Sequence, residues 1–441
     1  MIFCPRRQNP PWPHADQPVA LVAVRKRWPS TPTRNEPRSV LASWRESTGG
    51  LTQQAASALD QHGFRRRVDL GLPQPSEGYV LLPHAEAVLV RADPQRAAEA
   101  ADLLRRDFVV APDVALVAPS PPPEDACREI KLSQLDEENE FRWPEQSGIQ
   151  AAHERGNSGG GAVICVLDTG CDADHAEFLD RTVDFVYVPP RGSPRSVRGF
   201  ATDWHGTHVA AIAAGQRRGI APHAKLLAAG VLESDTYQSS LIRLAIALDW
   251  LQRRLESEEL AAVPAVLNLS LGFPATSLES PELRRALVTL RVMLAHLIDV
   301  YRVLVVAAVG NDGRDAEPRA PAFFPDVLSV GAISLGGEPA PFSSGGIGPP
   351  PYEMVDTPDV VGYGVDIMSA KERDVSGESW YRTCSGTSMA TPYVSGVAAL
   401  VATDTGLQGI ELAEYLKHHA LALPHPRRRV GDGLARVTST E

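Results

Sequence analysis

The chain has 441 residues, of which 43% are hydrophobic and 22% are charged. This composition is ordinary for a globular protein, and the length predicts two or three domains. The formal net charge of −11 argues against a nucleic-acid-binding protein, because no basic excess exists to neutralise phosphates. Solubility explains acidity of this size without any partner.

Three features of the sequence indicate the cellular compartment in which the protein works. The first residues, MIFCPRRQNPPWPHADQP, contain no apolar core of the kind that a secretory signal needs. The most apolar later stretch, 290–309, is interrupted by charged side chains, which predicts a helix followed by a buried strand rather than a membrane span. Five irregularly spaced cysteines do not indicate a disulfide framework. We expect a cytoplasmic protein without a membrane partner, although unconventional export would fit the same features.

The N-terminal third divides into three segments. Residues 1–77 are rich in Pro, Arg and Gln with weak periodicity, so we expect them to be loosely structured. Residues 78–120 contain two strand patterns, a helix pattern and two more strand patterns, which predict a compact α+β module. Residues 121–142 begin with three prolines and carry an acidic run, so an exposed linker is predicted.

Residues 143–441 alternate between apolar strand patterns and amphipathic helix patterns. AVICVLD, KLLAAGVL, AVLNLSLG and VLVVAAVG are nearly continuous apolar runs, and helix patterns lie between them. Strands of this kind are buried on both faces, which predicts a three-layer α/β/α sandwich with a mostly parallel sheet. Active groups are expected beyond the carboxyl ends of its strands.

Three polar segments stand at the edges of this predicted sheet. Asp168 ends the strand AVICVLD, His205 opens a helix, and Ser388 lies at the start of an apolar small-residue helix. Alone, each has a plain structural explanation: Asp168 and Ser388 could be helix caps. His205 and His208 could instead be a metal pair, but no further ligands stand nearby in a zinc-type spacing.

Taken together, the three segments point to one chemistry. Asp, His and Ser follow one another in the order found in subtilisins, and VLDTG, HGTHVA and SGTSMATPYVSG resemble the three active-site blocks of the subtilisin-like (S8) serine peptidases. Three further segments, VLNLSLG, VVAAVGNDG and FFPDVLSVGAI, also resemble blocks of that family. The resemblance covers residues 143–436.

The resemblance implies a serine endopeptidase with Asp168, His205 and Ser388 as its triad. Asn311 matches the asparagine of the oxyanion hole, and Ser270, Leu271 and Gly272 match the substrate-binding strand. No cofactor or metal is implied for the chemistry. Structural calcium is common in the family, but no loop here matches a calcium site. A peptide-maturing protease or macrocyclase of the same fold, and a catalytically dead binding scaffold, are the alternatives.

Some residues depart from the family pattern. Trp204 precedes the matched histidine where a small or polar residue is usual, and Gly345–Thr357 is an insertion that we expect to be a surface loop. Cys171 and Cys384 lie close in sequence to the triad, and packing explains small buried cysteines of this kind.

The resemblance also extends, more loosely, to the N-terminal module and to the specificity pocket. Residues 78–120 resemble the family's inhibitory prodomain in order, size and position, and an unrelated accessory domain is the alternative. Aligning on Pro321 puts Arg319 near the floor of the primary specificity pocket, where a guanidinium would favour an acidic substrate side chain. Alternatively, Arg319 points to solvent or pairs with Asp315 or Glu317.

Overall fold

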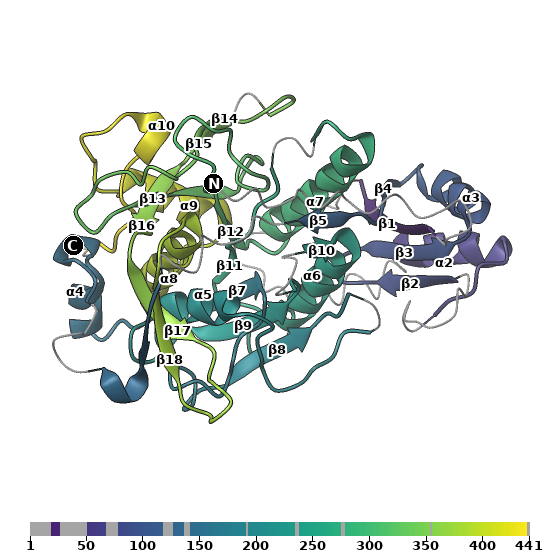
Figure 1. The fold of residues 1–441 in the computed structure, drawn as a ribbon. Coiled ribbons are helices and arrows are strands. Elements are labelled where there is room, and N and C mark those ends of the chain that lie inside the picture. Colours follow the sequence, from purple (N-terminus) through teal and green to yellow (C-terminus); the bar gives the residue numbers. More distant parts are fainter. Residues whose placement is uncertain are drawn as a thin grey trace, which may run out of the picture.

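The chain forms a larger part around a seven-stranded sheet and a smaller part around a four-stranded sheet (Figure 1). This computed structural model describes residues 19–26, 51–67, 78–117, 127–135, 142–190, 193–233, 238–274, 278–352 and 355–438. In the described residues, no helix is both long enough and apolar enough to span a bilayer.

The seven-stranded sheet has the order β16-β13-β12-β11-β7-β9-β8, and all of its neighbouring strands are parallel. Its strands are β7 (Val163–Asp168), β8 (Val183–Tyr187), β9 (Lys225–Gly230), β11 (Ala265–Leu269), β12 (Leu304–Ala308), β13 (Leu328–Ile333) and β16 (Val360–Tyr363). Parallel strands need crossover connections, and in the described residues helices lie in three of the six, between β8 and β9, between β9 and β11, and between β11 and β12.

Two helical layers cover this sheet because its strands are apolar on both faces. Along β7, Val163, Cys165 and Leu167 pack into one core, whereas Ile164 and Val166 pack into the other. The first core contains helices α6 (Leu241–Leu255) and α7 (Pro281–Asp299). The second contains α5 (Trp204–Ala214), α8 (Thr387–Thr405) and α9 (Gly409–His418). The predicted α/β/α sandwich is confirmed.

The smaller part is larger than the predicted module, because it recruits segments from residues 1–77. Its sheet has the order β2-β3-β1-β4, with β1 (Val19–Arg25) between its neighbours. The other elements are β2 (Gly78–Leu82), β3 (Ala87–Ala92), β4 (Phe108–Pro112), α2 (Leu51–Gln61) and α3 (Pro94–Leu104). The expectation of loose structure is therefore wrong for the described segments 19–26 and 51–67. We call this unit the N-terminal module.

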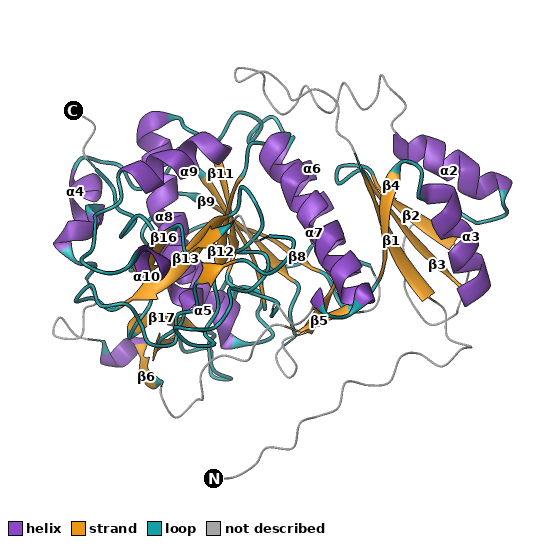
Figure 2. Cartoon of the chain, turned by 90° about the horizontal axis from the view of Figure 1, so that it is seen from above, coloured by secondary structure: helices purple, strands orange, loops and turns teal. Residues whose placement is uncertain are grey.

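The module's sheet is packed on both faces, which explains why β1 is a short apolar run. Leu21 and Ala23 face the module's own helices α2 and α3, whereas Val22 and Val24 join the core that contains α6 and α7. Helices α6 and α7 thus lie between the two sheets (Figure 2). After β4, strand β5 (Ala115–Val117) pairs antiparallel with β10 (Gln238–Ser240), which leads directly into α6.

The predicted linker contains a strand of the larger part. In its described residues, β6 (Arg128–Lys131) pairs with β18 (Trp380–Cys384), which also pairs with β17 (Ile367–Lys371). The segment REIK contains a single apolar residue and no alternation, so its sequence does not predict a strand. Shorter elements are the 3-10 helices η2 (Leu132–Gln134) and η4 (Glu145–Ser147), helices α4 (Ile149–Glu154) and α10 (Arg427–Val430), and the β14–β15 pair (Gly346–Ile347 with Asp356–Thr357) within the predicted insertion.

Candidate active site

The carboxylate of Asp168 and the imidazole of His205 are in direct contact. Asp168 is the last residue of β7 and is fully buried, and its Oδ1 lies 2.8 Å from His205 Nδ1. His205 is the second residue of α5, whose N-cap Asp203 accepts a hydrogen bond from the His205 backbone N–H. The cap and the strand end therefore fix both partners of this pair.

A close backbone approach brings α5 against the end of β7. A Cβ at Gly206 would lie only 2.1 Å from the carbonyl oxygen of Gly170, so glycine is required there. The Thr169 hydroxyl bridges the two segments, because it accepts from the Gly206 N–H at 2.8 Å and donates to the Asp203 carbonyl at 3.0 Å. Thr169 and Gly206 thus set the distance between Asp168 and His205.

Ser388 lies at the N-terminal end of the buried helix α8. Its hydroxyl donates to the carbonyl oxygen of Ser270 at 3.2 Å, and the Ser270 hydroxyl donates to the carbonyl oxygen of Ser388 at 2.9 Å. Asn268 and Ser395 extend this contact through two further hydrogen bonds of 3.0 Å. The predicted substrate-binding strand is therefore tied to the residue predicted as nucleophile.

Asn311, which follows β12, presents its side chain to the same place. Its Oδ1 accepts two hydrogen bonds of 2.9 Å, from the backbone N–H and from the hydroxyl of Thr387. These donors fix the orientation of the amide, so that Nδ2 lies on the side of Gly386. The Ser388 N–H is among the first N–H groups of α8, which have no partner within the helix. Two N–H donors are thus available beside Ser388.

The two histidines of the α5 motif have different environments. Burial alone would lower the pKa of His205, but the adjacent Asp168 carboxylate outweighs it, and the pKa is raised above its usual value. Burial lowers the pKa of His208 to about 3, and its Nε2 lies 2.9 Å from the Arg382 carbonyl oxygen. Each ring faces its own partner, so the structure does not bring them together as a metal pair. In the part of the chain that the structure describes, no three His, Cys, Asp or Glu side chains are grouped to hold a metal.

Trp204, the departure beside His205, has a packing role. Its ring contacts both His205 and His208 edge-on, with centroids 5.4 and 5.5 Å apart. The guanidinium of Arg382 lies over the same ring, 4.4 Å from its centroid. Trp204 therefore connects α5 to β18, the strand that precedes Ser388 in the chain.

Arg319 lies between Gly272, at the end of the segment matched to the substrate-binding strand, and Gly310, which directly precedes Asn311. Its aliphatic stem is so close to Gly272 and Gly310 that a Cβ at either glycine would come within 3 Å of it. The guanidinium forms a two-contact ion pair with Asp312, and its Nη1 lies 3.5 Å from the Gly272 carbonyl oxygen. Arg319 is buried, and neither Asp315 nor Glu317 is its partner in these contacts. Sequence reasoning missed Asp312, although it directly follows Asn311.

These features agree with comparisons to known proteins. A model described as the subtilase family (Peptidase_S8) matches residues 159–433. The chain is 39% identical over 350 residues to "Subtilisin-like protease PopC" of Myxococcus xanthus (strain DK1622), covering 76% of this chain and 72% of that one. It is 32% identical over 279 residues to "Subtilisin BL" of Lederbergia lenta, covering 62% and 88%.

A solved structure gives the same result. The crystal structure of a cold adapted subtilisin-like serine proteinase aligns with a TM-score of 0.50 and 27% identity, covering 64% of this chain and 91% of that one. The chain therefore belongs to the subtilase family. It is a subtilisin-like serine protease, and its substrates are proteins or peptides.

Proposed function

We propose that the protein is an endopeptidase that cleaves through an acyl-enzyme, with Asp168, His205 and Ser388 as its catalytic triad. The observation that carries this proposal is the 2.8 Å contact between Asp168 Oδ1 and His205 Nδ1, at the sheet edge where Ser388 and Asn311 also meet. A buried carboxylate on Nδ1 holds the imidazole so that Nε2 can act as a base.

The proposed reaction uses groups of this chain alone. The Ser388 hydroxyl gives its proton to His205 as the oxygen attacks the scissile carbonyl, and Asp168 stabilises the resulting imidazolium. Asn311 Nδ2 and the Ser388 N–H stabilise the oxyanion. His205 then protonates the leaving amine, and in the second half of the reaction it takes a proton from the attacking water and gives it to the Ser388 oxygen as the acyl group leaves. Each proton transfer has a side chain assigned to it, so the chemistry requires no cofactor.

One rearrangement precedes this reaction. The Ser388 hydroxyl donates to the Ser270 carbonyl in the structure, and attack requires it to donate to His205 Nε2 instead. Rotation about the Cα–Cβ bond of Ser388 redirects the hydroxyl without moving the helix. Catalytic hydrogen bonds are often loose in enzymes without bound substrate, so this conformation is compatible with the proposed role.

We propose further that the enzyme is made as a zymogen and that the N-terminal module is its intramolecular inhibitor. Strand β5 occupies the edge of β10 by antiparallel pairing, which is how an extended peptide binds a strand edge. Asp113, just before β5, accepts a 3.0 Å hydrogen bond from the Ile242 N–H at the start of α6. Burial raises the pKa of this carboxyl to about 6.

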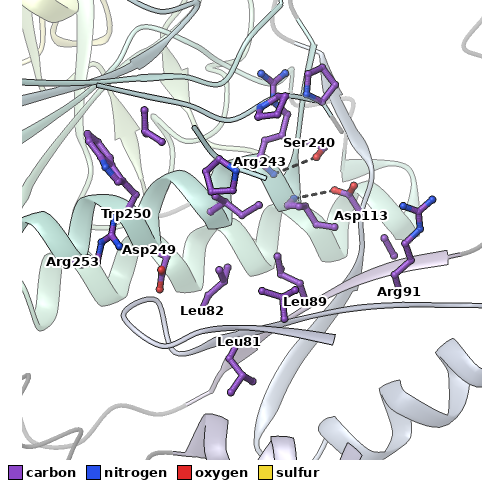
Figure 3. A pocket seen from close by; sticks show the side chains of 18 of the residues that line it. Leu81, Leu82, Leu89, Arg91, Asp113, Ser240, Arg243, Asp249, Trp250 and Arg253 are labelled. Carbon is purple, nitrogen blue, oxygen red and sulfur yellow. Dashed lines mark hydrogen bonds between the residues drawn. The ribbon is translucent and has the colours of Figure 1, made fainter. Parts of the chain in front are cut away.

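The interface between the module and α6 is incompletely filled. A cavity of about 500 Å³ separates parts of β2 and β3 from α6, and Leu82, Leu89, Arg243 and Trp250 are among its lining residues (Figure 3). Cavities forfeit dispersion contacts and weaken the packing around them. Such an interface suits an inhibitor that must later be removed.

Arg319 supports a proposal about cleavage specificity. The aliphatic part of its side chain narrows the space between Gly272 and Gly310. We therefore expect substrates with a large side chain on the residue preceding the scissile bond to be disfavoured. Its charge is balanced by Asp312, whose side chain is 38% exposed. A substrate carboxylate can replace Asp312 on the guanidinium, whereas an apolar side chain cannot, which gives a preference for acidic residues at this position.

The first prediction tests the triad and the oxyanion donors. We expect Ser388→Ala and His205→Ala to abolish peptidase activity without lowering thermal stability greatly, because both residues transfer protons or acyl groups. Asn311→Ala should lower kcat by about 10²–10³ with little change in KM, a magnitude taken over from an asparagine of subtilisin. Ser376→Ala, an exposed serine, is the matched control. Equal effects of Asn311→Ala on kcat and KM would contradict the oxyanion role.

The second prediction concerns pH. His205 must be neutral to accept a proton, and its pKa is raised, so kcat/KM should fall as the pH drops through a value above 6.5, the usual histidine pKa. Asp168→Asn removes the carboxylate that raises this pKa. The fall of kcat/KM at acidic pH, which is the acid limb of the profile, should therefore occur at a lower pH in that variant than in the parent. An unchanged acid limb would show that another group controls the profile.

The third prediction concerns the module. A fragment of residues 1–120 added in trans should inhibit the protease, whereas a 78–120 fragment should not, because it lacks the central strand β1. Leu116→Asp in the longer fragment is the matched variant, since this buried residue pairs with β10 and a charge there should abolish inhibition. If the intact 1–120 fragment is folded and still without effect in large excess, the inhibitor proposal fails.

The fourth prediction concerns Arg319 and Asp312. In a peptide library varied only at the residue before the cut, Glu or Asp should be favoured over Leu or Phe. Asp312→Ala unmasks the guanidinium and should strengthen that preference about tenfold, equivalent to about 1.4 kcal/mol. Arg319→Ala should abolish it and admit larger apolar residues. If Leu or Phe is cleaved best by the parent and both variants keep that order, Arg319 does not set specificity.

A further inference from the structure

Strands β6 and β18 pair their side chains in a regular cross-strand ladder. Their register places Lys131 opposite Trp380, and Lys131 Nζ lies 5.0 Å from the centroid of that ring. Two residues along, Glu129 lies opposite Arg382, and the two form an ion pair of 3.2 Å. Residues two apart on a strand share a face, so the ladder continues to the next pair on this face.

The next pair consists of two cysteines. Arg128 lies opposite Thr383 at the end of the pairing, and one more step in the same antiparallel register brings Cys127 opposite Cys384. Both side chains pack in the same apolar cluster, Cys384 as a buried member and Cys127 as a partly buried one. The strand register and the shared cluster thus place the two side chains next to each other.

The spacing of such a pair suits a covalent bond. Directly opposite residues in antiparallel strands have Cα atoms about 4.5 or 5.5 Å apart, and disulfides form across Cα separations of about 4.4–6.8 Å. The described cysteines carry free thiols in this structure. We propose that Cys127 and Cys384 form a cross-strand disulfide when the protein meets a disulfide oxidant such as oxidised glutathione. This inference does not rest on the proposed function.

The reaction proceeds by two thiol–disulfide exchanges. The Cys127 thiolate attacks one sulfur of oxidised glutathione, which forms a mixed disulfide and releases one glutathione thiolate. The Cys384 thiolate then attacks the Cys127 sulfur, forms the Cys127–Cys384 bond and releases the second glutathione. The two protein thiols lose two protons and two electrons, and the two glutathione molecules gain them.

The environment assigns the two sulfurs different roles. Cys127 is only partly buried, so it can meet the oxidant first. Burial raises the pKa of Cys384 to about 12, although the neighbouring Arg382 guanidinium opposes this. The attack by Cys384 should therefore be the slow step, and its rate should increase with rising pH. Cys165 and Cys171 are fully buried, and burial raises the pKa of both thiols, so we expect them to stay reduced.

The bond would join distant parts of the chain beside the active site. It closes a loop of 257 residues (384 − 127 = 257) between β6, which follows the module, and β18, which ends four residues before Ser388. Cross-links over long loops restrict the unfolded chain most. The oxidised protein should therefore resist heat better while its catalytic residues keep their positions.

The test uses the full chain with Cys4→Ser, because Cys4 lies outside the described residues. In a Ser388→Ala background, which prevents self-digestion, the protein is incubated with oxidised or reduced glutathione and mapped by non-reducing mass spectrometry. We expect a peptide pair linked through Cys127 and Cys384 only after oxidation, formed faster at pH 9 than at pH 7. The midpoint of thermal unfolding should rise by about 5 °C or more.

Cys127→Ser is the matched control, because its partly buried site tolerates a hydroxyl. With Ser388 intact, this variant should keep the peptidase activity of the reduced parent, and oxidation should not raise its unfolding temperature. Three outcomes would overturn the proposal: glutathione alone attached to Cys127, a linkage to another cysteine, or an equal thermal shift in Cys127→Ser. Because Cys384→Ser could disturb packing, the proposal is judged on Cys127→Ser and the mapped peptides.

Discussion

The convergence of parallel strand ends at one edge of the sheet is the constraint on which the rest of the structure depends. Because β7, β11 and β12 run in the same direction, Asp168, Ser270 and Asn311 emerge side by side although they are far apart in sequence. Helices α5 and α8 then begin at this edge and bring His205 and Ser388 to it. Polar side chains are stable at this edge because they form hydrogen bonds with neighbouring groups there, as Asp168 does with His205 and Ser388 does with Ser270.

Helices α6 and α7 perform two tasks in this arrangement. One side of each helix covers the seven-stranded sheet, and the other side contributes to the core shared with the module's sheet. If the module is released, as the zymogen proposal requires, the apolar surface that it covers on these helices would be exposed to solvent, where large apolar patches favour aggregation. Polar groups at this interface reduce the apolar share of that surface. One of them is Asp249, which accepts hydrogen bonds from the backbone of His84 and Ala85.

Much of the larger part could be predicted from sequence because its signals are local. Continuous apolar runs such as AVICVLD, and glycines beside polar residues, identify strands and their ends without knowledge of distant contacts. The same reasoning failed where a segment depends on a remote partner. Val19–Arg25 is a strand because it pairs with β3 and β4, which come later in the sequence. Arg128–Lys131 is a strand because it pairs with β18, which lies far away in the sequence.

The candidate site shows the same division. The positions of Asp168, His205, Ser388 and Asn311 follow from short motifs, and the structure brings Asp168 into contact with His205 and Ser388 into contact with Ser270. Sequence reasoning found the location of Arg319 but not its partner, because the pairing with Asp312 depends on how a seven-residue loop folds back. The Ser388–Ser270 contact likewise depends on a side-chain rotamer, which no sequence pattern encodes.

The position of β1 in its sheet has a consequence for the integrity of the module. The first described strand of the chain lies in the interior of its sheet, and its two neighbours come later in the sequence. Loss of β1 would therefore break the sheet in its interior, because β4 would lose the strand with which it pairs and would be separated from β3 and β2. If the module is the inhibitor proposed above, loss of Val19–Arg25 alone would be enough to abolish its inhibition.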